Sequence, residues 1–172
     1  TASRSSPACP ATTTSCDRGR PVSAVPTPET PLSAALAAAA DDGAWREAAK
    51  AGLAARRTEL RRRFEAGEAI DRLVGLCCEA SDTVVASAWA RCLPDEAPLQ
   101  LLATGGYGRA ELYPQSDIDL LVLGEPAAQK AHEAAIGRFF SLLWDAGLAT
   151  SQAVRSLAQC VEAAREDITV LT

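Results

Sequence analysis

The sequence has 172 residues, 48% of them hydrophobic, which is enough for one domain with a buried core. Its net charge is −5 at pH 7, and this argues against general affinity for nucleic acid, because such binding needs a basic surface that neutralises phosphates. No apolar run approaches the roughly 20 residues that a membrane-spanning helix requires, so no membrane association is expected.

Residues 1–31 form a distinct N-terminal segment that holds six of the ten prolines and almost no large apolar side chains. Such a composition cannot bury enough surface to offset the entropy of ordering, so we predict a disordered tail. The sequence contains no Met and ends inside the apolar run 168–171, so we expect a fragment of a longer protein.

The cysteines indicate a reducing, cytoplasmic environment. They form no Cys-x-x-Cys pair and only one histidine, His132, accompanies them, so a structural zinc site is not expected. Three of them fall in a predicted helix, where reduced and mostly buried thiols are expected. The six are Cys9, Cys16, Cys77, Cys78, Cys92 and Cys160.

A first helix is predicted over residues 32–66, which are rich in alanine and carry one apolar face, and Gly67 is expected to end it. A basic cluster on this helix has two interpretations: it contacts a phosphate group or a partner, or it is a solvated helix face. We favour the solvated face. The apolar face comprises Trp45, Ala49, Leu53, Leu60 and Phe64, and the cluster comprises Arg56, Arg57, Arg61, Arg62 and Arg63.

A second helix is predicted over residues 68–92, where apolar residues repeat at helical spacing. We interpret this stripe as part of the core, with Trp89 at its edge. The stripe comprises Ile70, Leu73, Val74, Cys77, Val84, Val85 and Ala88.

The remaining segments alternate between strand and helix. Strands are predicted over 99–103, 117–123 and 148–154, and helices over 127–146 and 157–165, the first ending at Gly147. Cys160, Val161 and Ala164 are expected to face inward. This order predicts an α/β protein: a helical segment (32–98) precedes a domain with a small mixed sheet (99–172).

The stretch between the first two strands carries the chemistry. A glycine-rich turn, Gly105-Gly106-Tyr107-Gly108-Arg109, follows the strand directly, and backbone amides without Cβ atoms can approach an anion closely. Residues 108–112 are compatible with one helical turn, and Arg109 is a candidate phosphate ligand. A Gly-Gly-x-Gly turn alone is weak evidence, because many such turns are simply tight loops.

Two carboxylates, Asp117 and Asp119, follow one residue apart at the start of the second strand. Side chains alternate along a strand, so the pair is expected on one face, where the two charges repel unless a cation lies between them. Mg²⁺ suits such a pair, because it takes oxygen ligands and leaves positions open for phosphate oxygens. A solvent-facing strand end is the alternative interpretation, but the nearby glycine turn favours phosphoryl chemistry.

The string Gly-Gly, a spacer and Ser-Asp-Ile-Asp-Leu resembles the signature of the polymerase-β-type nucleotidyltransferase superfamily. The longer string GGYGRAELYPQSDIDLLVL is similar to the N-terminal domain of the bacterial bifunctional uridylyltransferase/uridylyl-removing enzyme family. The similarity extends over about residues 50–172. It includes Arg61–Phe64, Leu143–Leu148, Ala153–Ser156 and Asp167–Val170.

The resemblance implies transfer of UMP from UTP to a tyrosine of the PII signal-transduction protein, with release of pyrophosphate. It places the UTP triphosphate at Gly105 and Gly106 and Mg²⁺ at Asp117 and Asp119. It also places Arg109 and Ser116 in the loop that holds the nucleotide or the metal. For Arg109, a salt bridge with Glu111 is the structural alternative. Adenylyl transfer and a non-catalytic nucleotide-binding module remain open.

Three departures from the family pattern bear on the site. Tyr113 and Gln115 stand where the family usually has His and Tyr. The third predicted strand carries no carboxylate, although superfamily enzymes often place one there. Asp145 and Asp167 are the nearest substitutes, and both are more readily interpreted as structural. The family's phosphohydrolase and glutamine-sensing domains have no counterpart in this sequence.

Overall fold

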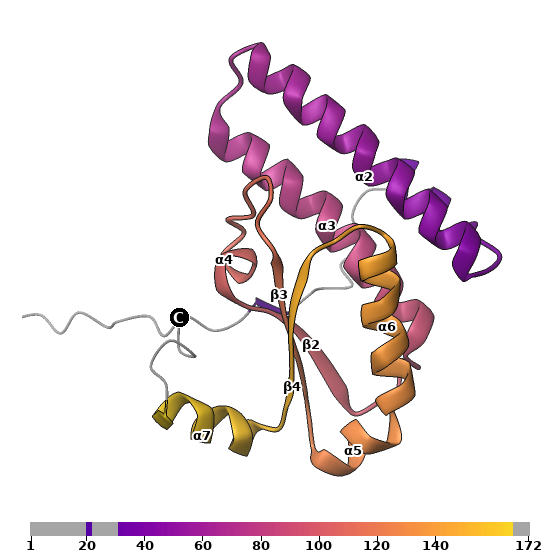
Figure 1. Cartoon of the computed structure of the whole chain (residues 1–172), viewed down its shortest axis with the longest axis vertical. Coiled ribbons are helices and arrows are strands. Elements are labelled where there is room, and N and C mark those ends of the chain that lie inside the picture. Colours follow the sequence, from indigo (N-terminus) through magenta and orange to yellow (C-terminus); the bar gives the residue numbers. More distant parts are fainter. Residues whose placement is uncertain (1–19, 22–30, 167–172) are drawn as a thin grey trace, which may run out of the picture.

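The computed structural model describes residues 20–21 and 31–166, which form a mixed α/β structure (Figure 1). The sheet has the strand order β1-β2-β3-β4, with β2 antiparallel to β3 and β3 parallel to β4. The predicted α/β class and mixed sheet are therefore confirmed. The strands are β1 (Arg20–Pro21), β2 (Leu99–Ala103), β3 (Ile118–Gly124) and β4 (Thr150–Arg155).

The longest helices, α2 and α3, form an antiparallel pair that projects beyond the sheet, while α6 lies on one side of the strands and α4 and α7 lie on the other (Figure 1). The helix α3 packs against α1, α2 and α6. The helices are α1 (Pro31–Ala37), α2 (Asp42–Glu65), α3 (Ile70–Cys92), α4 (Gly105–Gly108), α5 (Pro126–Ala131), α6 (Glu133–Asp145) and α7 (Leu157–Glu166).

One core joins these helices to the sheet. Alternate residues of β3, namely Ile118, Leu120 and Val122, are buried, as the alternation of side chains along a strand requires. On the helical side, Trp89 of α3 meets Phe139 of α6 edge to face, with ring centroids 5.2 Å apart. Since β3 buries one set of alternate residues, Asp119 belongs to its opposite face.

Two predicted helices are each interrupted. The segment 32–66 is two helices because Asp41, with φ −140°, breaks the run and its Oδ1 accepts the Ala44 N–H at 2.8 Å, which caps α2. The segment 127–146 divides into α5 and α6 at His132, whose φ of −111° is not helical. Gly67, with φ +81°, follows the end of α2 as predicted.

Two residues that were predicted to face inward are exposed, so those predictions are wrong: Ile70 at the start of α3 and Val161 in α7. Phe64, which belongs to the predicted apolar face of α2, is exposed as well. Helical spacing predicts which residues share a face of a helix, but not whether another element packs against that face. The end of α2 and the start of α3, to which Phe64 and Ile70 belong, lie where the helix pair extends past the sheet (Figure 1), and α7 contains no buried residue.

The described cysteines are free thiols, as predicted. Cys78 is buried and Cys77, Cys92 and Cys160 are partly buried. Burial raises the pKa of the Cys77 and Cys92 thiols, which favours their protonated form. Cys9 and Cys16 lie outside the described residues.

The helix α3 is long and apolar enough to cross a membrane by length and composition alone, which differs from the expectation that no segment would qualify. That test is also passed by core helices of water-soluble proteins. Eight residues of α3 are buried within the fold, among them Val84, Val85 and Ala88. We therefore interpret α3 as a core helix.

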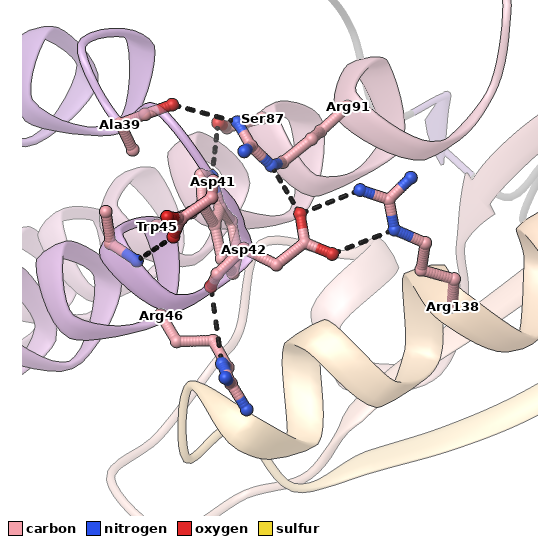
Figure 2. A network of polar contacts seen from close by, with 9 residues as sticks. Ala39, Asp41, Asp42, Trp45, Arg46, Ser87, Arg91 and Arg138 are labelled. Atoms are coloured by element: carbon pink, nitrogen blue, oxygen red, sulfur yellow. Dashed lines mark hydrogen bonds and ion pairs between the residues drawn. The ribbon is translucent and has the colours of Figure 1, made fainter.

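Asp42 joins α2, α3 and α6 (Figure 2). Its carboxylate accepts two hydrogen bonds from Arg138 at 2.7 and 2.9 Å and one from Arg91 at 2.8 Å. Beside it, the buried Trp45 donates from Nε1 to Ser87 Oγ at 2.9 Å. The hydrogen bonds from Arg138 and then Arg91 lower the pKa of Asp42 to about 2.

We expect Asp42→Asn to lower the free energy of unfolding by about 1 kcal/mol at pH 7, a value reduced because a third of the side chain is exposed to screening solvent. The folded pKa lies below the unfolded value of 3.8, so this contribution is complete above pH 3.8 and declines as pH falls towards 2. Urea unfolding at pH 7 and pH 3 measures it. Asp71→Asn, also in the first turn of a helix, is the control and should change stability little.

Candidate functional site

The glycine-rich turn is itself a short helical turn. Thr104 precedes it in an extended conformation, and its N–H donates to the Asp119 carbonyl at 3.0 Å, which fixes the turn to β3. The Gly108 N–H donates to the Thr104 carbonyl at 2.7 Å. A Cβ on Gly108 would lie 2.7 Å from the Ala103 carbonyl oxygen, so the turn fits closely against the end of β2.

The helical turn predicted over 108–112 is therefore misplaced, because it spans Gly105–Gly108. It ends there because the N–H groups of Arg109 and Glu111 both donate to the Gly106 carbonyl, at 3.2 and 2.9 Å. Ala110 then adopts φ +60°, a left-handed conformation that does not continue a right-handed helix.

Gly105 lies directly against the Asp119 side chain. A Cβ at Gly105 would overlap Asp119 Oδ2, and Gly105 has φ +57°, in the left-handed region that favours glycine. Residues from both halves of the motif, predicted to act together, are thus in contact. The contact brings the glycine turn and a candidate metal ligand into one site.

The two carboxylates are electrostatically coupled. Burial raises the pKa of Asp119, and the charge of Asp117 raises it further, while a hydrogen bond with Ser151 and the charge of Arg109 lower it. Asp117 is exposed and lies one residue before β3, so the strand starts one residue later than predicted. Ser151 is opposite Asp119 in the parallel β3–β4 register.

Tyr107 anchors the turn to the helical layer. Its ring is buried and its hydroxyl donates to Asp82 Oδ1 of α3 at 2.5 Å. The sequence motif gave no signal for this bond, because Asp82 is 25 residues away on a helix whose orientation depends on the assembled fold. The bond holds the glycine turn in a fixed position relative to α3.

We expect Tyr107→Phe to lower the free energy of unfolding by about 1–2 kcal/mol, because it removes a buried hydrogen bond to a carboxylate and leaves Asp82 with one donor fewer. Thermal unfolding followed by circular dichroism measures the loss. Tyr113→Phe changes the other, exposed tyrosine and should leave the unfolding temperature unaltered. Equal effects of the two substitutions would contradict the assigned role of Tyr107.

The other predicted nucleotide-binding residues lie around this turn. Arg109 forms an ion pair with Glu111 at 2.9 Å, the structural alternative considered for that pair, and is also near enough to Asp119 to affect its pKa. Gly106 presents its carbonyl to the residues that end the turn. Ser116 donates its N–H to the Tyr113 carbonyl at 3.0 Å and lines a cavity between α2 and α3.

No third carboxylate joins the pair among the described residues. Strand β4 carries none, and the described residues hold no cluster of three or more His, Cys, Asp or Glu suited to a metal. Asp145 instead pairs with Arg46 at 2.9 Å and so connects α6 to α2. Asp167 lies outside the described residues.

The two carboxylates suit a hard divalent cation whose remaining ligands come from water and from the phosphates of a bound substrate. Asp117 and Asp119 supply oxygen atoms only, and the raised pKa of Asp119 reflects in part a repulsion that a cation would relieve. Mg²⁺ is usually bound by one or two carboxylates together with substrate phosphates and water. The absence of a Cβ at Gly105 leaves the Asp119 carboxylate room beside the turn.

Comparison with known proteins identifies related sequences. The chain is 53% identical over 133 residues to the bifunctional uridylyltransferase/uridylyl-removing enzyme of Xanthomonas campestris pv. campestris (strain B100), a match that covers 77% of this chain and 15% of that protein. Proteins of the same name in Xanthomonas euvesicatoria pv. vesicatoria (strain 85-10) and Stutzerimonas stutzeri (strain A1501) are 49% identical over 144 residues and 47% identical over 117. These matches cover 84% and 67% of this chain and 16% and 13% of those proteins.

No family model matches the chain, and no solved structure matches it. The chain spans about 15% of the length of the relatives it matches, so the comparison concerns one small part of those enzymes. Within that part, about half of the residues are identical over most of this chain. This chain is therefore a relative of the bifunctional uridylyltransferase/uridylyl-removing enzymes and corresponds to a small portion of them.

Proposed function

We propose that this chain is the nucleotide-binding part of a uridylyltransferase with a polymerase-β-type nucleotidyltransferase fold. The observation that carries the proposal is the contact of Gly105 with Asp119, which combines a phosphate-accessible turn with a carboxylate pair. The mixed sheet and the identity with proteins named uridylyltransferases support it.

In this proposal, Asp117 and Asp119 hold Mg²⁺, which supplies positive charge to the phosphate oxygens of UTP when it is bound. The backbone of Gly105 and Gly106 lies against the triphosphate, and Arg109 and Ser116 flank it. Tyr107 keeps the turn in place through Asp82, and Ser151 orients Asp119 by its hydrogen bond. Asp145 takes no part, because its partner is Arg46.

The proposed acceptor is a tyrosine hydroxyl of a PII signal-transduction protein. Its oxygen forms a bond to the α-phosphorus of UTP, the bond from that phosphorus to the bridging oxygen breaks, and pyrophosphate leaves. The phenolic proton passes to solvent. We place the reaction in the cytoplasm, in keeping with the free thiols of the described cysteines, and expect no nucleic-acid partner for a chain of net charge −5.

A chimaera tests the proposal. This chain replaces the matching segment of the Xanthomonas campestris relative, and the product is incubated with Mg²⁺, PII protein and α-³²P-labelled UTP or ATP, beside the unaltered relative. Label on PII from UTP alone is the expected result. Label from ATP alone would establish adenylyl transfer, and nucleotide binding without label from either would establish a non-catalytic module.

A further inference from the structure

The basic cluster of α2 divides into two groups. Arg62 and Arg63 form ion pairs with Glu59 at 2.8 and 2.7 Å, and Arg63 also approaches Glu68 at 3.5 Å. Arg56, Arg57 and Arg61 form no ion pair with any residue that the structure describes. These three arginines all line one cavity, which the paired Arg62 and Arg63 do not.

The cavity has a volume of about 740 Å³ and lies between α2, α3 and the loops at 112–116 and 147–149. We call it the arginine groove. Its described lining contains no Asp or Glu, although acidic residues outnumber basic ones in the sequence, 22 to 17. Its rim exposes three large apolar side chains: Phe64 is 61%, Ile70 50% and Tyr113 53% exposed. The groove is therefore both apolar and locally positive.

The shape of the groove favours a helical segment over a compact molecule. On α2, the lining residues run from Leu53 to Phe64 at helical spacing, a length of about 16 Å or three turns. On α3, they run from Ile70 to Ser81. Grooves between two helices accept an amphipathic helix whose anchors repeat at i, i+3, i+4 and i+7.

We propose that the arginine groove binds an acidic amphipathic helix of a partner protein. Apolar side chains of that helix cover Phe64, Ile70 and Tyr113, and its carboxylates pair with Arg56, Arg57 and Arg61. Charge complementarity selects an acidic partner, because the lining offers three cations and no anion. The groove also contains Ser116 and Ile118, on either side of Asp117, so a bound helix would lie beside the proposed nucleotide site, but its binding can be measured without the transfer reaction.

The test uses a fluorescein-labelled peptide of about 16 residues with Leu at i, i+3, i+4 and i+7 and Glu and Ala elsewhere. Fluorescence anisotropy should show binding that weakens with added salt. The triple substitution Arg56→Gln, Arg57→Gln, Arg61→Gln should raise Kd roughly tenfold or more, and Phe64→Ala should act similarly. Arg62→Gln, on the same helix but outside the groove, is the matched control and should change Kd less than about twofold.

Two further arms complete the experiment. A peptide with Lys in place of Glu should not bind, and equal binding of the two peptides would refute charge selection. No binding of the acidic peptide at millimolar concentration, or an equal effect of Arg62→Gln and the triple substitution, would overturn the proposal. Sedimentation of the chain alone tests another occupant: a dimer abolished by Phe64→Ala would assign the groove to a second copy instead.

Discussion

Asn in place of Asp117 or Asp119 is expected to reduce uridylyl transfer by roughly a thousandfold, because each substitution removes a negative oxygen ligand of the proposed Mg²⁺ site. Stability should behave in the opposite way. The charge of Asp117 raises the pKa of Asp119, so the two carboxylates repel each other in the folded protein. Removing one charge relieves that repulsion, and the unfolding temperature should stay the same or rise.

A substitution that abolishes transfer but keeps or raises the unfolding temperature identifies a functional carboxylate, because loss of a structural carboxylate would lower that temperature. Transfer is measured in the chimaera, and Mg²⁺ binding and thermal unfolding are measured for the chain itself. Asp145→Asn is the matched control: it breaks an exposed ion pair with Arg46, which is worth about 0.5 kcal/mol, and should leave transfer intact. Full activity of Asp119→Asn would refute the metal assignment, and loss of activity in Asp145→Asn would identify Asp145 as a third carboxylate.

The sequence predicted the limits of an element well where an apolar run and the turn residues beside it indicate the same boundary. The strand over 99–103 has the predicted limits, because a short apolar run bounded by Pro98 and Gly105 has few other ways to bury itself. The break between α1 and α2 was missed, because the alanines before it favour helix. The cap at Asp41 is a local bond that competes with that propensity.

Periodicity predicted which residues share a face, but not which faces are covered. Trp45, Val84 and Val85 are fully buried as expected. Phe64 and Ile70 continue the same stripes at the end of α2 and the start of α3, and they are 61% and 50% exposed. The exposed ends of both stripes thus lie at the arginine groove, which Phe64 and Ile70 line.

The candidate site shows the same limit of sequence information. The sequence identified Gly105 and Asp119 as parts of one motif, but their contact depends on the pairing of β2 with β3. Ser151 was not identified, because its place opposite Asp119 depends on the parallel register of β3 and β4. The helices α5 and α6 separate these two strands along the chain, so their register cannot be read from either strand alone.

Gly105→Ala is expected to impair the site, because it combines a left-handed backbone conformation with a direct contact to a proposed metal ligand. Alanine at φ +57° costs about 1–2 kcal/mol, and the new Cβ would overlap Asp119 Oδ2. Relief of that overlap requires either the turn or the Asp119 carboxylate to move. Because a displacement of about 1 Å in a reacting site costs roughly a hundredfold in rate, we expect transfer to fall by at least that factor.

A second glycine provides the control for this substitution. Gly137 lies in α6 with nothing within 4 Å of an added Cβ, so Gly137→Ala should stabilise the chain by about 0.5–1 kcal/mol through helix propensity. Thermal unfolding, Mg²⁺ titration and transfer in the chimaera are compared for both variants. Gly105→Ala should lose stability, Mg²⁺ affinity and transfer together, whereas Gly137→Ala should gain stability and retain the other two. Wild-type Mg²⁺ affinity in Gly105→Ala would show that Asp119 does not depend on the space that glycine leaves.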